Sequence, residues 1–203
     1  MRRWASAALA ALARGYSGAS MSDRDYLRAA DARPTLVGDR ARIRPGSLDD
    51  VQPLRAILTE PAVAYWWGEP DSADEIAADL LGDMSSVLLV IEIAGQVVGG
   101  IQFHEENTPM YRHAGIDIFL TGRQHDRGMG TEAVRLLAKF LCEQRGHHRL
   151  TIDPAAANQR AIRCYEKVGF RPVGLMRRYE RGPDGQLHDG LLMDLLREEL
   201  TSA

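Results

Sequence analysis

The chain has 203 residues, of which 45% are hydrophobic and 26% are charged, and its formal net charge at pH 7 is −3. This length and composition predict one globular domain with its own core, and the slight negative charge leaves no basic field for binding nucleic acid. The sequence contains no apolar run of the roughly 18 residues that a membrane-spanning helix needs. We expect a cytoplasmic protein without a membrane or nucleic-acid partner, and either a monomer or a homodimer, a choice that the sequence does not make.

Residues 1–34 are predicted to be a flexible extension, followed by one domain over residues 35–200. Residues 1–20 are rich in alanine and arginine and contain no acidic residue, which superficially resembles a targeting segment. The alternative is that Met21 is the working initiator and that the preceding residues form a mobile, non-catalytic tail. We favour this alternative, which predicts that truncation to Met21 leaves activity intact.

The first predicted elements of the domain are an edge strand over residues 36–44 and a helix that starts near Val51. The strand has alternating apolar positions, and Ser47 and Asp50 have the spacing of a capping box ahead of the helix. A second helix is predicted over residues 72–81. Because both short helices follow the first strand, they are expected to form a flap on the substrate side.

Between these helices, Tyr65-Trp66-Trp67 places three aromatic residues together in a segment without strong periodicity. Three adjacent rings cannot all face one core, so at least one ring is expected to line a cleft. There it can stack on a sugar ring or contact a cation. The alternative is a loop that covers the core.

Residues 87–103 predict a hairpin of two largely buried strands with a turn at Ala94-Gly95. Gly99 and Gly100 indicate a bulge or a close backbone contact in the second strand, because glycine weakens a strand unless another group approaches it.

The next strand, predicted over residues 111–120, carries Asp117 among apolar neighbours. A carboxylate is costly to bury without a partner, so Asp117 is expected to face a polar cleft, a cation or backbone donors. A carboxylate near a cationic amine can accept its proton directly or through water. Asp117 is therefore the first candidate for a general base, and a purely structural role is the alternative.

A glycine-containing loop follows this strand and leads into a third helix. Gly128 and Gly130 allow the backbone to come close to a ligand, and the start of the helix presents N–H groups with a partial positive charge. The backbone from Arg127 to Thr131 is therefore expected to bind a phosphate group. The spacing does not fit a nucleotide triphosphate loop or a dinucleotide fingerprint, and a tight turn without a ligand is the alternative.

Two pairs of residues could suggest metal or redox chemistry. Cys142 and Cys164 fall on apolar helix faces, which favours buried reduced thiols over a disulfide or a metal site. His147 and His148 are adjacent, and adjacent residues on a strand point to opposite faces. We therefore interpret them as a solvated strand entry.

The fifth strand is predicted to end at Asp153, where a cleft would open if the fourth and fifth strands diverge. Asn158 is a suitable N-cap for a fourth helix, which Gly169 ends. The last two strands are predicted to pair around Pro183-Asp184-Gly185, and this hairpin is unusually charged.

Several of these stretches together resemble the GNAT acetyltransferase superfamily. The glycine loop is similar to its phosphate loop, and the helix pattern Asn158-x-x-Ala161-x-x-x-Tyr165-x-x-x-Gly169-Phe170 is the more specific match. Over roughly Val37 to Leu196, the sequence is most similar to aminoglycoside 6′-N-acetyltransferases. The matching segments are Trp66-Trp67-Gly68, Gly115-Ile116-Asp117, Asp153-Pro154 and Ala161-Ile-Arg-Cys-Tyr-Glu-Lys167.

The resemblance implies an α/β (α+β) fold with a mixed, mostly antiparallel sheet of about seven strands, flanked by four helices, and a V-shaped cleft between strands four and five. It implies acetyl-CoA as co-substrate and no metal. Asp117 would be the general base, Tyr165 would protonate the departing thiolate and Asn158 would hold the pantetheine arm; on helical spacing alone, Tyr165 would be a core residue. Further cofactor contacts are expected from Ile118, Phe119, Leu120, Arg127, Gly128, Met129, Gly130 and Thr131, and substrate contacts from Tyr65, Trp66, Gln102 and Asp153.

Two features depart from the pattern of the resembled enzymes. His125 stands where the superfamily usually has glutamine or arginine, although backbone amides can bind a diphosphate whatever that side chain is. The final hairpin is longer after its turn than we expect for the aminoglycoside enzymes. This second departure concerns the acceptor pocket rather than the chemistry.

The expected activity is acetyl transfer to a small-molecule primary amine, and the leading hypothesis is the 6′-amino group of an aminoglycoside, which would confer antibiotic resistance. One alternative is another amine, such as a protein N-terminus, a polyamine or a hydroxylated metabolite. The other is a non-catalytic sensor that binds an aminoglycoside or an acyl-CoA. Release of thiol from acetyl-CoA in the presence of an amine would exclude the sensor.

Overall fold

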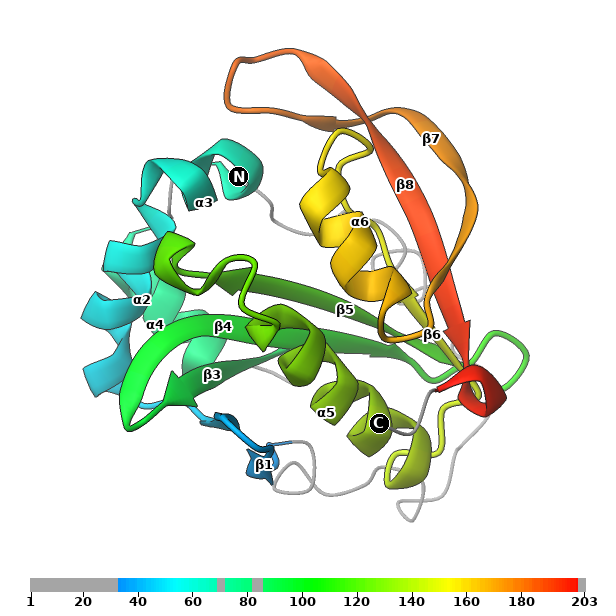
Figure 1. Ribbon diagram of the computed structural model, residues 1–203, viewed down its shortest axis with the longest axis horizontal. Coiled ribbons are helices and arrows are strands. Elements are labelled where there is room, and N and C mark those ends of the chain that lie inside the picture. Colours follow the sequence, from blue (N-terminus) through cyan, green and yellow to red (C-terminus); the bar gives the residue numbers. More distant parts are fainter. Residues whose placement is uncertain (1–32, 69–71, 82–85, 201–203) are drawn as a thin grey trace.

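The computed structural model describes residues 33–68, 72–81 and 86–200, which form one open sheet with helices on both faces (Figure 1). Residues 1–32, and with them the predicted extension and the choice of start residue, lie outside these ranges. The strands are β1 (Leu36–Val37), β2 (Ala41–Pro45), β3 (Val87–Ile93), β4 (Gln96–Glu106), β5 (His113–Leu120), β6 (Arg149–Ile152), β7 (Arg171–Arg181) and β8 (Leu187–Leu196). The α-helices are α2 (Val51–Leu58), α3 (Pro61–Trp67), α4 (Ala73–Leu81), α5 (Met129–Glu143) and α6 (Gln159–Glu166).

The predicted fold class is confirmed, with one more strand than expected. The strand order is β1-β2-β3-β4-β5-β6-β8-β7, and all neighbours are antiparallel except β5 and β6. The described residues contain eight strands rather than about seven because the predicted edge strand over 36–44 reverses direction. The N–H of Gly38 donates to the carbonyl of Ala41 at 2.8 Å, and Leu36 then pairs with Ile43.

The described residues also contain five α-helices rather than four, because the aromatic segment is helical. Glu60 has an extended backbone and is the N-cap of α3, and Pro61 is its first residue. There the fixed φ of proline suits a helix and its missing N–H costs nothing. The helix ends at Gly68, which has a φ of 77°. Seven residues are too few to show a helical period in the sequence.

Two hydrophobic clusters cover the two faces of the sheet. Alternate residues of β3 belong to different clusters: Leu89 and Ile91 join the cluster that contains α5, while Leu88 and Val90 join the one that contains α2 and α4. A strand that is buried on both faces has a continuous apolar sequence. Figure 1 shows α5 and α2–α4 on opposite sides of the sheet, and α6 beside the β7–β8 hairpin.

The β3–β4 hairpin forms as predicted, with left-handed φ angles of 49° at Ala94 and 76° at Gly95 in its turn. The register shifts after Ile91, which gives β4 a bulge. A Cβ atom at Gly99 would lie 2.1 Å from the carbonyl oxygen of Phe119 on β5. Glycine therefore allows β4 to approach β5 closely, so the close backbone contact predicted for this strand is confirmed.

Strands β5 and β6 join at two positions and then diverge. Ala114 pairs with Leu150 and Gly115 pairs with Thr151, in parallel. Beyond these pairs, β5 continues to Leu120 along β4. The gap between the carboxyl ends of β5 and β6 is the V-shaped cleft that was predicted between strands four and five.

The closed end of this cleft contains a buried ionic cluster that links three elements. Glu105 of β4 lies 2.5 Å from Nη2 of Arg145, which follows α5, and 2.7 Å from Nε2 of His147, which precedes β6. Burial alone would raise the pKa of Glu105, but the hydrogen bonds from His147 and Arg145 outweigh it and lower that pKa to about 2. The prediction that His147 lies in a solvated strand entry is wrong, since its side chain is completely buried.

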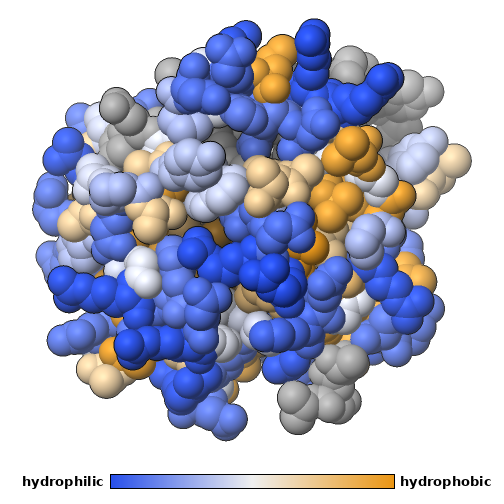
Figure 2. Space-filling model, turned by 45° about the horizontal axis from the view of Figure 1, so that its top comes forward, coloured by the Kyte–Doolittle hydropathy of each residue, from blue (hydrophilic) through white to orange (hydrophobic). Residues whose placement is uncertain are grey.

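None of the helices in the described ranges is long and apolar enough to cross a membrane. The face shown in Figure 2 is mostly hydrophilic, with apolar side chains gathered in one part of it. On β7, Val173 and Leu175 are both more than half exposed. The last hairpin thus presents a larger share of its side chains to the surface than the central strands do.

Candidate active site

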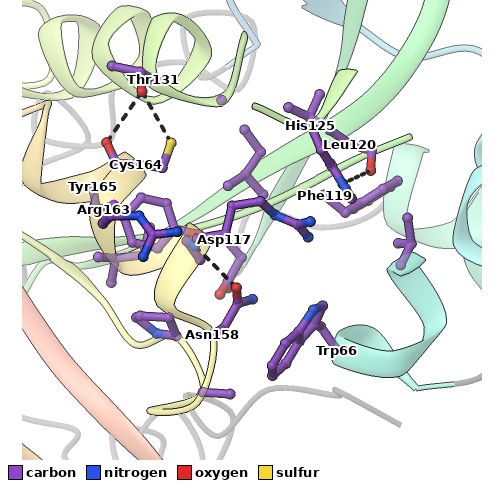
Figure 3. A pocket seen from close by; sticks show the side chains of 18 of the residues that line it. Trp66, Asp117, Phe119, Leu120, His125, Thr131, Asn158, Arg163, Cys164 and Tyr165 are labelled. Atoms are coloured by element: carbon purple, nitrogen blue, oxygen red, sulfur yellow. Dashed lines mark hydrogen bonds between the residues drawn. The ribbon is translucent and has the colours of Figure 1, made fainter. Parts of the chain in front are cut away.

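A cavity of about 210 Å³ lies where β5 and β6 diverge (Figure 3). Its walls are the second half of β5, the start of α5, the segment after β6, the cleft side of α6 and the end of α3. Among the predicted site residues, those that line it are Trp66, Asp117, Ile118, Phe119, Leu120, Gly128, Gly130, Thr131, Asp153, Asn158 and Tyr165.

Asp117 points into this cavity from β5 (Figure 3). It is opposite Gln102 of β4, and residues opposite each other in an antiparallel pair lie on the same face of the sheet. Gln102 is buried, and its Nε2 donates a hydrogen bond to Oδ2 of Asp117 at 3.3 Å. The amide fixes the direction of the carboxylate, so Asp117 presents an oriented hydrogen-bond acceptor to the cavity. Asp153 lines the cavity after β6.

The amino end of α5 forms another part of the wall. Gly128 is its N-cap, with a φ of 80°, and the helix continues for 15 residues. A Cβ atom at Gly130 would lie 3.0 Å from Sγ of Cys164 on α6, so glycine allows α5 and α6 to pack closely. The first N–H groups of such a helix have no intrahelical partner and attract an anion.

Arg127 and Met129, which were predicted to hold the cofactor, are not among the residues that line the cavity. Met129 begins α5, but its side chain is buried in the core. The carbonyl oxygen of Arg127 accepts a hydrogen bond from Arg40, which follows β1. Of the segment from Arg127 to Thr131, only Gly128, Gly130 and Thr131 line the cavity.

His125, which departs from the superfamily pattern, is tied to the end of β5. Its Nε2 lies 3.0 Å from the carbonyl oxygen of Leu120. Burial and the charge of Arg160 lower the pKa of His125, which favours the neutral imidazole. A carbonyl only accepts hydrogen bonds, so Nε2 carries the proton in this contact. The ring therefore holds the loop against β5.

Helix α6 forms another side of the cavity. Oδ1 of Asn158 accepts a hydrogen bond from the N–H of Ala161 at 3.1 Å, which confirms the predicted N-cap. Tyr165 is 7% exposed and packs edge-to-face on Phe170, and it also lines the cavity. The two interpretations of Tyr165, as a core residue or as a site residue, are therefore compatible in space.

Cys142 is buried in the core, as the sequence predicted, whereas Cys164 is partly exposed and also lines the cavity. Burial raises the pKa of the Cys164 thiol, although a contact with Thr131 opposes that shift. A raised pKa keeps the group as a thiol, which is a poor nucleophile.

Three cations that the sequence analysis did not single out also line the cavity: Arg160, Arg163 and Lys167. Positions three, four and seven residues apart lie along one side of a helix. Within the described ranges, none of the three forms an ion pair with a carboxylate. Cations without a carboxylate partner beside a helix N-terminus suit a ligand with several phosphate charges. The sequence pattern that could have identified these three cations is their three- and four-residue spacing. This spacing puts them on the side of α6 away from the buried Ile162.

The three adjacent aromatic residues of α3 all line the second hollow described below, and Trp66 and Trp67 also line the cavity, but their rings make different contacts. Trp67 packs edge-on to Phe119 at 5.0 Å, at the border of the second core cluster. Trp66 lines the cavity, and Tyr65 is 63% exposed with its ring edge-on to Trp66 at 4.7 Å. The expectation that the rings cannot share one core is confirmed.

A second, larger hollow of about 580 Å³ adjoins the cavity at Trp66 and Ala155. Tyr65 and the tip of the β7–β8 hairpin line it. The hairpin contributes a hydrogen-bonded pair to this wall, because Nε2 of His188 lies 2.9 Å from Oδ1 of Asp184. In the described part of the chain, no group of three or more histidine, cysteine and acidic residues is placed to hold a metal ion.

Comparison with known proteins connects this geometry to a family. The profile of the acetyltransferase (GNAT) domain matches residues 40–171. The chain is 28% identical over 170 residues to aminoglycoside N(6′)-acetyltransferase type 1 of Klebsiella pneumoniae, which covers 74% of this chain and 82% of that protein. It is 24% identical over 163 residues to spermidine N(1)-acetyltransferase of Escherichia coli K12, which covers 78% of this chain and 87% of that protein.

Among solved structures, the aminoglycoside acetyltransferase AAC(6′)-Ib in complex with coenzyme A and kanamycin matches with a TM-score of 0.64 at 25% identity. The match covers 78% of this chain and 96% of that chain. The family profile spans more than half of the sequence and includes both the loop before α5 and all of α6. The chain therefore belongs to the GNAT acetyltransferase family and is related to aminoglycoside 6′-N-acetyltransferases and to a spermidine acetyltransferase.

Proposed function

We propose that this protein transfers the acetyl group of acetyl-CoA to the 6′-amino group of an aminoglycoside. The observation that carries the proposal is that one cavity is lined by a carboxylate, Asp117, a tyrosine, Tyr165, and the amino end of α5. Direct transfer from a thioester to an amine needs a base, an acid and a site for the cofactor phosphates. These three groups can supply all of them.

Asp117 is the proposed general base. Its carboxylate, oriented by the Gln102 amide, would accept a proton from the substrate ammonium, directly or through one water. The free amine would then attack the acetyl carbon, so no nucleophilic residue of the protein is required. Cys164 is close by, but the raised pKa of its thiol argues against a covalent role.

The segment Ile118–Leu120 would supply backbone N–H groups to the oxygen that becomes negative during the attack. Tyr165 would donate its hydroxyl proton to the departing sulfur. Both assignments need only groups that line the cavity.

The cofactor phosphates would lie at the amino end of α5, where the Gly128–Gly130 segment allows close approach. Arg160, Arg163 and Lys167 would add positive charge from α6. Asn158, at the start of α6, would contact the pantetheine arm. In this arrangement the acetyl group points away from α5 and toward Asp117.

The acceptor side suits a molecule with several ammonium groups. Asp153 lines the cavity together with Asp117, and Trp66 lies between the cavity and the second hollow with a ring that can stack on a sugar. Asp184 and Asp189 of the hairpin line the second hollow. Carboxylates spaced over two joined hollows favour an elongated polycation. The relationship to an aminoglycoside N(6′)-acetyltransferase supports the same acceptor class.

A thiol-release assay with acetyl-CoA tests this function. Kanamycin and tobramycin would be compared with a panel of simple amines, polyamines and peptides with a free N-terminus. We expect turnover with an aminoglycoside. If no aminoglycoside is acetylated, the proposed acceptor is wrong, and if no amine at all releases thiol, a non-catalytic sensor becomes the better explanation.

A polyamine is the second candidate acceptor, supported by the match to spermidine N(1)-acetyltransferase and by the acidic residues of the second hollow. It would use the same base and acid. Preferential turnover of spermidine over kanamycin in the same assay would select it.

A further inference from the structure

One contact joins the phosphate loop to the turn between β1 and β2. Nη2 of Arg40 donates a hydrogen bond to the carbonyl oxygen of Arg127 at 3.0 Å. Nε of the same guanidinium lies 3.5 Å from Oε2 of Glu132, in the first turn of α5. Oε1 of Glu132 in turn accepts the backbone N–H groups of Arg40 and Ala41, at 2.8 and 2.9 Å. Arg40 is exposed, yet contacts at both its backbone and its guanidinium fix its position.

The loop that Arg40 reaches has an unfavourable backbone conformation. Asp126 has a φ of 58° and Gly128 has a φ of 80°. Glycine adopts such a φ at no steric cost, and aspartate tolerates it better than most residues with a Cβ atom but still at a cost, so contacts that fix the neighbours of Asp126 favour this conformation. Arg40 is placed to give that support, because its hydrogen bond fixes the carbonyl of Arg127, the residue directly after Asp126.

The hydrogen bond also determines which way one peptide group points. The peptide between Arg127 and Gly128 is trans, so its C=O and N–H point in opposite directions. The C=O points toward Arg40, and Arg127 is not among the residues that line the cavity. The N–H of Gly128 therefore points away from Arg40, and Gly128 itself lines the cavity. In the flipped orientation the peptide would present a carbonyl oxygen instead, which repels a phosphate.

We propose that Arg40 is a positioning residue for the cofactor diphosphate: it holds the carbonyl of Arg127 so that the N–H of Gly128 faces the cavity. It acts through the loop and does not contact the cofactor. The inference rests on the proposed function, because it requires that the loop binds the diphosphate of acetyl-CoA. Glu132 contributes by anchoring Arg40 to the first turn of α5.

The test is Arg40→Met, with Arg42→Met as a matched control. Arg42 follows two residues later, its side chain is 53% exposed against 55% for Arg40, and it pairs with Glu92 on β3 instead of the loop. Calorimetry with CoA is expected to give a roughly tenfold higher Kd for Arg40→Met, the effect of one lost hydrogen bond from a charged donor. The Arg42→Met variant is expected to bind CoA like the wild type.

Acetyl-pantetheine, which lacks the diphosphate, is the discriminating donor. Its kcat/KM is expected to be the same in the wild type and in both variants. Equal losses with acetyl-CoA and acetyl-pantetheine would overturn the inference, and so would an unchanged Kd for CoA in Arg40→Met. Thermal melting checks the fold, and Arg40→Gln replaces the methionine variant if the latter is unstable.

The amide NMR signal of Gly128 in the ligand-free protein separates positioning from direct contact. Arg40→Met is expected to shift this signal and Arg42→Met is expected to leave it in place. An unshifted signal together with weaker CoA binding would mean that Arg40 touches the phosphates itself, which contradicts the inference. A wild-type protein that does not bind CoA would reject the proposed function instead, so the two failures are distinguishable.

Discussion

The two sides of the cleft are built differently. The side proposed to hold the cofactor, here called the donor wall, is formed by the second half of β5, the start of α5 and the cleft side of α6. It consists mainly of backbone and of side chains rooted in the core, such as the buried Tyr165, with the exposed cations Arg163 and Lys167 at its edge. The acceptor wall, formed by α3, residues 155–157 and the β7–β8 hairpin, presents surface side chains. Tyr65 is mostly exposed there, and Asp184 and His188 are about half exposed.

This difference predicts that the two halves of the proposed reaction are not equally constrained. A backbone donor or a core residue cannot change without disturbing the fold, whereas an exposed side chain can be replaced at a cost of a few tenths of a kcal/mol. The donor wall is therefore expected to dictate the cofactor, and the acceptor wall to tune which amine enters. The following substitutions test that division.

The largest effect is expected from Asp117→Asn. An amide cannot accept the ammonium proton, so kcat should fall by a factor on the order of 10² to 10⁴. The Kd for CoA should remain nearly unchanged, because the phosphates are proposed to bind at the other end of the donor wall. Steady-state kinetics and calorimetry measure the two quantities. A variant with undiminished turnover would rule out Asp117 as the base.

Glu105→Gln is expected to lower the free energy of unfolding by about 3 kcal/mol, because it leaves buried Arg145 and His147 without a carboxylate. The cluster lies at the closed end of the cleft, so both walls depend on it. Urea unfolding measures the loss. Glu143→Gln, on the exposed end of α5, is the control, and similar values for the two variants would contradict a structural role for the cluster.

The same cluster predicts a dependence of stability on pH. The pKa of Glu105 is lowered to about 2 in the folded protein, so its contribution is fully present above the ordinary glutamate pKa and is lost as the pH falls toward 2. Urea midpoints from pH 6 downward should fall more steeply in the wild type than in Glu105→Gln. Parallel curves would argue against the lowered pKa.

Arg163→Ala is expected to weaken CoA binding by about three- to tenfold, since it removes one of the cavity-lining cations of α6 from an exposed position. The effect should shrink as salt is added, because salt screens exposed charges. The KM of the acceptor should not change. Arg177→Ala, an exposed cation of β7 outside both hollows, is the control. If only the KM of the acceptor rose, Arg163 would belong to the acceptor wall, which would contradict its assignment to CoA binding.

The smallest effect is expected from Tyr65→Ala. It removes an exposed ring from the second hollow, so the KM of a polycationic acceptor should rise by roughly two- to fivefold while the Kd for CoA stays constant. Competition between kanamycin and spermidine would show whether the ring also sets the preference between acceptors. Tyr111→Ala, similarly exposed but outside both hollows, controls for surface changes.

The sequence was most informative where local chemistry and fold agree. Asp117 among apolar neighbours, the glycines before α5 and the N-cap Asn158 are each explained by one strand or one helix end. The structure brings all three to one cavity. The close approach at Gly99 was also predictable, because glycine weakens a buried strand unless another group comes close to its backbone.

The sequence was least informative where a side chain depends on a distant partner. His147 looked like part of a solvated strand entry, but its partner Glu105 lies 42 positions earlier and no local pattern connects them. The spacing of the α6 cations can be seen in the sequence. That they lie beside the amino end of α5, where they suit a ligand with phosphate groups, follows only from the fold. The placement of Tyr65 opposite the final hairpin depends on the whole sheet.

Gly115 is the last residue of β5 that pairs with β6 before the strands separate. The ring of His104 lies directly over it, and a Cβ atom at Gly115 would be only 2.0 Å from Cε1 of that ring. An alanine at this position would therefore force the His104 ring or the strand to move, next to the point where β5 leaves β6. Because Asp117 follows Gly115 by two positions on the same strand, any backbone shift forced at Gly115 would reach the carboxylate that the proposed reaction uses as its base.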